Sequence, residues 1–175
     1  MTRIRPQPLV VTLKLDTFSF AGFDDLRRRY FPAERNFIPA HVTLFHALPG
    51  EQEQNIICAL HEVCSKTPVL NLYFSGVRFL GSGVAIEIAC PGLLKLRRHL
   101  AREWEQWLGA QDKGGYRPHI TIQNKVDAAD ARRLFESLRE GWVPFAGKAE
   151  GLSLWHYRGG PWERAGEFSF IKEDA

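Results

Sequence analysis

The chain has 175 residues, of which 45% are hydrophobic and 25% charged, and its formal net charge is +3 at pH 7. This length is enough for one substantial domain or two small, closely packed lobes, and the composition is ordinary for a soluble globular protein. No apolar run approaches the roughly 18 residues of a membrane helix. The charge is too small for a dedicated binder of duplex nucleic acid, although it permits an anionic ligand.

Two features near the N-terminus and among the cysteines predict a cytoplasmic protein. The apolar stretch over 9–15 is broken by polar residues and does not predict a secretory signal. The cysteines are odd in number and lack the spacing of a metal site, which favours reduced, buried thiols. They are Cys58, Cys64 and Cys90.

Hydrophobic periodicity predicts a mixture of strands and helices along the chain. The first predicted elements are a strand over 9–15, a helix over 23–30, a strand over 40–48 and a helix over 51–65. Next come hairpin strands over 69–80 and 84–90, a helix over 91–108, a strand over 119–124 and a helix over 127–138. The last predicted strands cover 143–148, 152–157 and 167–171.

The order of these elements contains a loose duplication. Each half has a strand with a histidine and a threonine, followed by a helix and then a pair of strands. No low-complexity linker separates the halves, so residues 1–175 are expected to form a single domain. We expect an α+β fold in a bilobed, duplicated arrangement, with antiparallel or mixed sheets, outer helices and a central cleft.

One short pattern marks both of these strands. His41-Val42-Thr43-Leu44 is repeated as His119-Ile120-Thr121-Ile122. Chance predicts roughly 0.1 matches to His-x-Thr-hydrophobic in a chain of this composition, so two matches are a specific signal. In a strand, the histidine and threonine of each copy share one face about 7 Å apart, while the hydrophobic residues face a core.

Two imidazoles on two strands suit the cleavage of a phosphodiester. In-line attack at phosphorus needs one group to take a proton from the nucleophile and another to protonate the leaving oxygen. His41 and His119, with unperturbed pKa values of about 6.5, can divide these roles near neutral pH. Thr43 and Thr121 can hold the non-bridging phosphate oxygens. Water as nucleophile gives hydrolysis of a cyclic phosphate, and a ribose hydroxyl in the reverse reaction gives ligation.

The paired motifs resemble the 2H phosphoesterase superfamily, which includes 2′–5′ RNA ligase-like proteins and cyclic nucleotide phosphodiesterases. The spacing of the motifs, the duplicated order and the preceding residues Pro39 and Pro118 also resemble that family. The resemblance implies a bilobed α+β fold with both histidines in the cleft and with no metal or organic cofactor. It further implies that His119 is the base and His41 the acid in hydrolysis, with an RNA end or a nucleotide-like phosphate as substrate.

Residues next to the motifs are candidates for binding the substrate. Phe45 and Gln123 extend the two motif faces by one more step and can contact a sugar or base. Tyr116 and Arg117 closely precede the second motif and can reach a phosphate or stack on a base.

A late strand alternates aromatic and cationic side chains. Trp155 and Tyr157 share one face, and His156 and Arg158 share the other. If the His156 face lines the cleft, Arg158 is placed to bind phosphate. If it does not, Trp155 and Tyr157 can stack on a base, although core packing is the favoured interpretation of these aromatic residues.

Other polar residues are interpreted as structural. His46 lies five residues after His41, so strand alternation predicts that it faces away from the cleft. The runs Arg27-Arg28-Arg29 and Arg97-Arg98 lie on predicted helices, where a solvated face is favoured over contact with RNA.

The sequence therefore predicts a metal-independent phosphodiesterase that acts on 2′,3′-cyclic phosphates or 2′–5′ bonds. A zinc site is disfavoured because neither half supplies further ligands near its histidine. Two alternatives stay open: a non-catalytic RNA or nucleotide-binding module, and a phosphoesterase for a small non-RNA metabolite. Turnover of any cyclic phosphate would exclude the binding module, and a steep salt dependence would indicate a polyanion.

Overall fold

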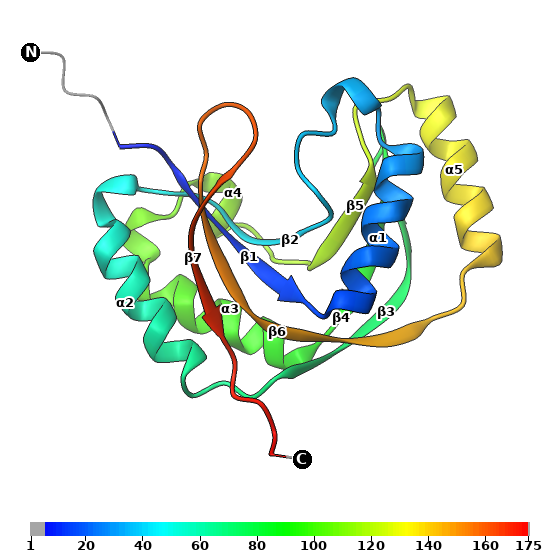
Figure 1. The fold of residues 1–175 in the computed structure, drawn as a ribbon. Helices are drawn as coiled ribbons and strands as arrows, with labels where there is room; N and C mark the ends of the chain where they lie inside the picture. Colours follow the sequence, from blue (N-terminus) through cyan, green and yellow to red (C-terminus); the bar gives the residue numbers. More distant parts are fainter. Residues whose placement is uncertain (1–5, 175) are drawn as a thin grey trace, which may run out of the picture.

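The computed structural model describes residues 6–174, which contain one sheet of seven strands. The strand order is β2-β1-β6-β3-β4-β5, and β7 pairs with β6 beside this path (Figure 1). All of these pairs are antiparallel. The strands are β1 (Leu9–Leu15), β2 (Val42–Leu48), β3 (Leu70–Phe79), β4 (Val84–Ala89), β5 (His119–Gln123), β6 (Phe145–His156) and β7 (Glu163–Ser169).

The long strand β6 joins two lobes. Its first part pairs with β3 and its last part with β7, while β1 runs along its other edge. One lobe therefore contains β3, β4 and β5, and the other contains β1, β2 and β7, which confirms the bilobed α+β prediction. The prediction of two strands over 143–148 and 152–157 is wrong, because the backbone stays extended between them. The last strand begins at Glu163 rather than at Glu167.

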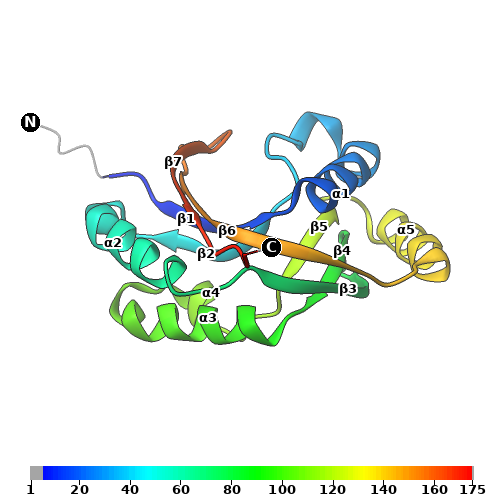
Figure 2. The ribbon, with the colours of Figure 1, turned by 60° about the horizontal axis from the view of Figure 1, so that its bottom comes forward.

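Helices cover the outer faces of both lobes (Figure 2). α1 packs against β5 and α5 against β3, whereas α2 contacts β7 and β6, and α4 contacts β2. The helices are α1 (Thr17–Tyr30), α2 (Glu53–Cys64), α3 (Pro91–Glu103), α4 (Ala110–Lys113) and α5 (Ala128–Gly141). α1 begins before the predicted start at 23 because the carboxylate of Asp16 accepts a hydrogen bond from the Ser19 N–H and caps the helix. The short helix α4 was not predicted.

Strand alternation in β1 separates a core face from a cleft face. Leu9, Val11 and Leu13 are buried in the core, which also contains Ile56 of α2 and Leu93 of α3. Thr12 and Lys14, which alternate with these residues, point to the opposite face of the sheet, where they line a cavity described below. In this lobe, α2 and α3 thus cover the core side of β1, and the cavity lies on its other side.

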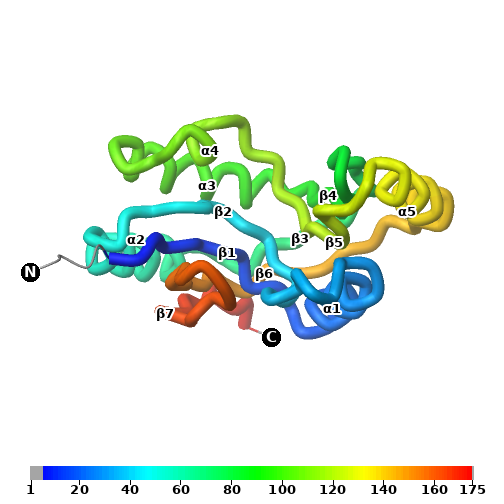
Figure 3. Tube along the Cα trace, turned by 90° about the horizontal axis from the view of Figure 1, so that it is seen from above, coloured from blue at the N-terminus to red at the C-terminus, as the bar shows by residue number. Residues whose placement is uncertain are grey.

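The two motif strands lie at the two ends of the strand order. The sheet curls so strongly that β2 and β5 come into contact, although four strands lie between them in the sheet (Figure 3). Segments 78 positions apart in the sequence numbering, at His41 and His119, are thereby brought to one opening.

Two predictions drawn from composition can be compared with the structure. Of the three free cysteines, Cys64 and Cys90 are buried as predicted, whereas Cys58 is exposed on α2. No helix in the described part of the chain has the length and apolar character needed to cross a membrane.

Candidate active site

Both motif histidines are held in the same way by the main chain. Nδ1 of His41 donates to the carbonyl of Pro39, and Nδ1 of His119 donates to the carbonyl of Arg117, each at 2.8 Å. Because a carbonyl can only accept, Nδ1 carries the proton in each neutral ring and Nε2 keeps its lone pair. Both rings are therefore fixed in the tautomer whose Nε2 can exchange a proton with a substrate.

The surroundings lower the pKa of both imidazoles. Burial lowers the pKa of His41 to about 4, against the hydrogen bond to Pro39, and the charges of Arg27 and His119 lower it further. Burial also lowers the pKa of His119, and the cation of Arg78 adds to this effect. Each protonated ring is disfavoured near other positive charges. In the free protein, both rings are therefore mainly neutral at pH 7.

A β-bulge follows the threonine of the first motif. Thr43 pairs with Thr12, but Phe45, two residues later, pairs with the adjacent Val11. The extra residue, Leu44, reverses the alternation of side chains along β2. Phe45 has no exposed surface. The prediction that Phe45 extends the motif face and contacts the substrate is therefore wrong.

The second motif has the same irregularity. Thr121 pairs with Ala85, whereas Gln123 pairs with the adjacent Val84, so Ile122 is the extra residue. Gln123 is only 8% exposed. It lies on the buried side of β5 rather than on the face of Thr121, and the prediction of a direct substrate contact is wrong for the same reason as at Phe45.

The bulge in β2 also changes the position of His46. Since Phe45 turns into the core, the next side chain, His46, emerges on the face of Thr43. A charge on His46 is close enough to lower the pKa of both His41 and His119. The prediction that His46 faces away from the cleft is therefore wrong.

Asp112 of α4 fixes this third histidine. Its carboxylate accepts hydrogen bonds from Nδ1 and the backbone N–H of His46, both at 2.9 Å, and from the backbone N–H of Ala47 at 3.1 Å. Burial would raise the pKa of Asp112, but these hydrogen bonds hold it below its usual value. Nothing in the sequence pattern pointed to Asp112, because it lies on a helix that was not predicted and far from His46 in the chain.

Side chains donate hydrogen bonds to free carbonyls at the outer edges of both motif strands, and we call this edge closure. The carbonyl of Thr43 accepts a hydrogen bond from the hydroxyl of Tyr116 at 3.0 Å, and the carbonyl of Thr121 accepts one from Nη1 of Arg27 at 2.9 Å. Burial raises the pKa of Tyr116, so its hydroxyl keeps the proton that it donates. Tyr116, predicted as a substrate contact, thus uses its polar atom to hold the strand of the first motif.

The two arginine runs are not simply solvated helix faces. Arg27 is 4% exposed and Arg97 is 6% exposed. Arg27 closes β5, and Nε of Arg97 donates to the carbonyl of Leu44 in β2 at 2.8 Å. Only their neighbours behave as predicted: Arg28 and Arg29 are exposed and pair with acidic residues on the same helix.

Charged side chains gather beside the second motif. Arg117 pairs with Glu87 at 2.5 Å, and Arg78 lies 3.8 Å from the same carboxylate. In the sheet, Arg78 of β3 lies opposite Ala85 of β4, and Ala85 lies opposite Thr121 of β5. Arg78 and Thr121 therefore share one face of the sheet. Arg78 was not predicted as a site residue, although its position as a single cation in the apolar end of a predicted strand was a signal. Arg117 is exposed, as a phosphate-binding role would require.

The alternation at the end of β6 places Trp155 on the cleft face. Its Nε1 donates to the hydroxyl of Thr12 at 2.8 Å. His156 points to the opposite face and pairs with a carboxylate of α2 at 2.9 Å. Of the two arrangements considered, the one with the Trp155 face toward the cleft is present. Beyond the strand, Tyr157 is exposed, and Arg158 pairs with a carboxylate of β7.

No three His, Cys, Asp or Glu side chains of residues 6–174 lie together in a group that could hold a metal ion. The groups that are present can exchange protons through two Nε2 atoms and donate hydrogen bonds from two threonine hydroxyls. They are placed on facing strand edges, with arginine nearby.

Comparison with solved structures identifies the same fold. A crystal structure of TT0787 from Thermus thermophilus matches with a TM-score of 0.67 and 19% identity, covering 95% of this chain and 100% of that chain. E. coli LigT complexed with 3′-AMP matches with a TM-score of 0.64 and 16% identity, covering 94% and 98%. A structure described as a phosphoesterase matches with a TM-score of 0.63 and 18% identity, covering 94% and 98%.

No curated protein matches the chain in sequence. The family model of the 2′-5′ RNA ligase superfamily, however, matches residues 15–161, a range that includes both His-x-Thr motifs and the strands that carry them. The paired motifs, the curled sheet and this match agree, and the chain belongs to the 2′-5′ RNA ligase superfamily.

Proposed function

We propose that the protein is a metal-independent phosphodiesterase that cleaves RNA-related 2′,3′-cyclic phosphates or 2′–5′ phosphodiester bonds. The observation that carries this proposal is the matched presentation of His41 and His119, each held at Nδ1 by a carbonyl on one of two facing strand edges. Family membership supports it. So do the complexes of E. coli LigT with 3′-AMP, NADP+ and ATP, which are all nucleotides.

In this mechanism the phosphate lies between the two imidazoles. One neutral Nε2 takes a proton from the attacking water as the new P–O bond forms, and the other ring donates a proton to the ribose oxygen as its bond to phosphorus breaks. Thr43 and Thr121 donate hydrogen bonds to the non-bridging oxygens, where negative charge increases in the transition state. Arg78, on the face of Thr121, adds a fixed positive charge. The anionic phosphate raises the pKa of the acid, so that this ring is protonated when substrate is bound.

The pKa of both imidazoles is lowered by burial, which does not distinguish the base from the acid. The resemblance implies that His119 is the base and His41 the acid. A nucleoside 2′-(p-nitrophenyl phosphate) tests this assignment, because its leaving group needs no proton. We expect this substrate to restore turnover to the variant that lacks the acid, His41→Ala, and not to His119→Ala.

The function is tested by a screen of nucleoside 2′,3′-cyclic phosphates and 2′–5′ dinucleotides. We expect turnover by the unaltered protein and a loss of at least about 10²-fold in His41→Ala and in His119→Ala, with circular dichroism confirming that both variants are folded. Full activity in either variant would overturn the mechanism. Absence of turnover with every substrate, together with phosphate binding, would instead support a non-catalytic binding module.

We also propose that the protein is cytoplasmic and forms a single domain. The free thiols support a cytoplasmic location. The shared strand β6, which pairs with strands of both lobes, supports a single domain over the whole chain.

A further inference from the structure

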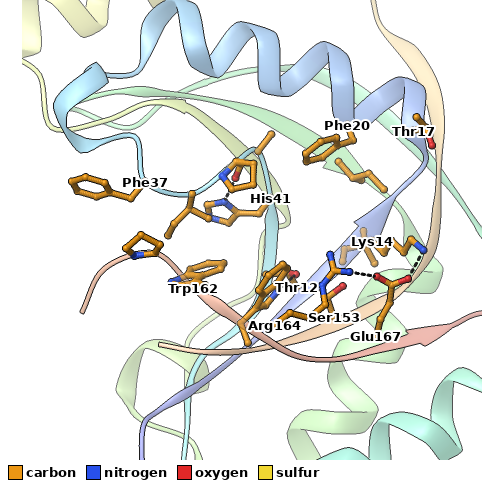
Figure 4. A pocket seen from close by; sticks show the side chains of 17 residues that line it. Thr12, Lys14, Thr17, Phe20, Phe37, His41, Ser153, Trp162, Arg164 and Glu167 are labelled. Atoms are coloured by element: carbon orange, nitrogen blue, oxygen red, sulfur yellow. Dashed lines mark hydrogen bonds and ion pairs between the residues drawn. The ribbon is translucent and has the colours of Figure 1, made fainter. Parts of the chain in front are cut away.

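An aromatic cavity of about 360 Å³ marks one side of the first motif. His41 is part of its wall, and the ring centroid of His41 lies 4.8 Å from that of Trp162. The large aromatic side chains around it include Phe20, Phe37 and Trp162 (Figure 4). Along β1, the wall of the cavity runs from Thr12 to Leu15. The cavity therefore extends from the motif toward the end of β1.

His46 lies on the other side of the motif. Thr43 pairs with Thr12, and the antiparallel register continues from there to Leu48 at the end of β2. His46 lies between Thr43 and Leu48, whereas the cavity extends from Thr12 in the opposite direction. The bulge after Thr43 turns the imidazole to the cleft face, and this side chain is 40% exposed. The two sides of the first motif thus present different groups, an aromatic cavity and an imidazole.

The charged groups of the cavity are held away from the first motif. Lys14 pairs with the carboxylate of Glu167 at 2.5 Å, and Arg164 pairs with it at 3.1 Å. Glu167 lies on β7, three strand spacings from Thr43 on β2, because direct pairs link β2 to β1, β6 and β7 in turn. This is a distance of roughly 14 Å. These cations are therefore too far from Thr43 to contact a phosphate that it holds.

A buried carboxylate fixes the ring of His46. The side chain of Asp112 is 2% exposed and accepts a hydrogen bond from Nδ1 of His46 at 2.9 Å. Since a carboxylate only accepts, Nδ1 carries a proton, and Nε2 is the nitrogen left for a ligand. Behind β2, Arg97 of α3 donates to the backbone carbonyl of Asp112 at 2.7 Å. The ring is thus oriented from inside the protein while its other edge faces the cleft.

The charge of His46 acts on both motif histidines. It lowers the pKa of His41 and also that of His119, which lie on facing strand edges. A group that influences both rings lies near the space between them. Like charges disfavour the protonation of all three rings in the free protein, and an anion bound between them removes this repulsion. The position of His46 therefore suits contact with the same phosphate.

We propose that His46 is a third catalytic residue, whose Nε2 donates a hydrogen bond to a non-bridging oxygen of the phosphate between His41 and His119. The inference rests on the proposed function, because it takes the phosphate position from that mechanism. The bound anion favours the protonated ring, and the carboxylate of Asp112 balances its charge. The pair as a whole stays neutral, so it adds a directed donor rather than net charge. Because charge on the phosphate oxygens increases in the transition state, this hydrogen bond is strongest there.

Two substitutions separate the roles of the two ring nitrogens. The amide nitrogen of asparagine reaches the position of Nδ1 and keeps the hydrogen bond to Asp112, whereas that of glutamine reaches the position of Nε2 and keeps the donor to phosphate. With adenosine 2′,3′-cyclic phosphate, we expect His46→Asn to lower kcat about 10²-fold. His46→Gln should stay within about ten-fold of the unaltered protein. A ring that only supports the strand predicts the reverse order, and that order would overturn the proposal.

Binding of inorganic phosphate gives a second measurement. Calorimetry should show affinity about ten-fold weaker in His46→Asn, and a smaller loss in His46→Gln. His99→Asn is the matched control, because His99 also faces a carboxylate, that of Glu103 at 3.9 Å, but lies 65% exposed on α3. We expect it to behave like the unaltered protein in both assays.

The outcomes separate this proposal from the proposed function. Turnover with unchanged kcat in His46→Asn would overturn the role of His46 and leave the proposed function intact. Absence of all turnover, with phosphate binding weakened by His46→Asn more than by His46→Gln, would support the contact and overturn the proposed function. If His46→Asn does not fold, ¹⁵N spectra of the unaltered protein decide. Added phosphate should move the Nε2 signal of His46 toward the protonated form, and an unmoved signal would overturn the proposal.

Discussion

The two motif strands β2 and β5 resemble each other closely at the reacting groups and differ in what surrounds them. In both, Nδ1 of the histidine donates to the carbonyl two residues earlier, and a bulge follows the threonine. The carbonyl of that threonine accepts a hydrogen bond from a side chain elsewhere in the chain. The same local geometry thus positions the histidine and threonine of both motifs.

The residues around the two motifs differ between the lobes. The first motif lies next to the aromatic cavity and to His46, which is held by Asp112. The second lies next to Arg78 and Arg117, which share the carboxylate of Glu87. Positive charge is thus concentrated beside the second motif, whereas aromatic side chains gather beside the first.

The largest expected effect comes from the histidines themselves. Replacing either His41 or His119 with alanine removes one proton-transfer group, and kcat should fall by about 10²–10⁴-fold. The double variant should be only slightly slower than either single variant, because the two groups act in one step. Steady-state kinetics with a cyclic nucleotide checks this. Independent, multiplicative losses would show that the two strands do not share one reaction.

The threonines should separate the two strands. Thr43→Val keeps the shape of the side chain and removes the hydroxyl, so we expect kcat to fall by about 10²-fold. Thr121→Val should cost less, because in the proposed mechanism Arg78 on the same face still supplies a positive charge for the phosphate oxygens. Comparing kcat for both variants, and for Thr121→Val combined with Arg78→Met, measures the difference. Equal losses in the two single variants would contradict the unequal division of charge.

The buried arginines should affect stability similarly in both lobes. Arg27→Met and Arg97→Met each leave buried carbonyls without a donor, which should lower the free energy of unfolding by about 1–3 kcal/mol. The exposed neighbours provide the controls, and Arg28→Met and Arg98→Met should change it by no more than about 0.5 kcal/mol. Urea denaturation gives all four values. A change at the buried positions no larger than at the exposed ones would rule out edge closure as their role.

The pH dependence should show the smallest effect, a displaced optimum. The base must be neutral and the acid protonated, so kcat/KM is maximal between the pKa values of the two histidines in the free protein. Since both pKa values are lowered, and that of His41 to about 4, the optimum of kcat/KM should lie below pH 6.5. The optimum of kcat should lie at higher pH, because bound phosphate raises both values. An optimum of kcat/KM above pH 7 would contradict the lowered pKa values.

Much of the fold was predictable because it depends on local patterns. Hydrophobic spacing, with Gly and Pro at the ends of elements, predicts several of them. These are strand β1, the hairpin of β3 and β4, and the helices after each motif strand. The catalytic candidates were found because a short pattern occurs twice. Strand β6 was divided in the prediction because glycine and charged residues interrupt its apolar pattern, yet pairing with β1 keeps it extended.

The rest of the site depends on tertiary contacts that no local pattern records. A bulge shifts the register by one residue, and that shift reverses the predicted positions of Phe45, Gln123 and His46 together. Arg27 and Arg97 look like surface cations in the sequence, since their burial becomes favourable only when strand edges with unpaired carbonyls lie against them. Trp162 joins the site through a loop whose course is set by the pairing of β6 with β7.

The way in which the strand edges are closed has a consequence for synthesis of the protein. Arg27, near the start of the chain, closes β5, which is made late, while Tyr116 and Arg97 close β2, which is made early. A nascent chain that has emerged from the ribosome only as far as β4 already contains His41 but not the residues that close its strand. Likewise, a chain cut between α2 and β3 would leave each fragment with one motif and one unprotected edge. The protein can therefore close both motif strands only after most of the polypeptide has been made, so an incomplete chain lacks the finished cleft.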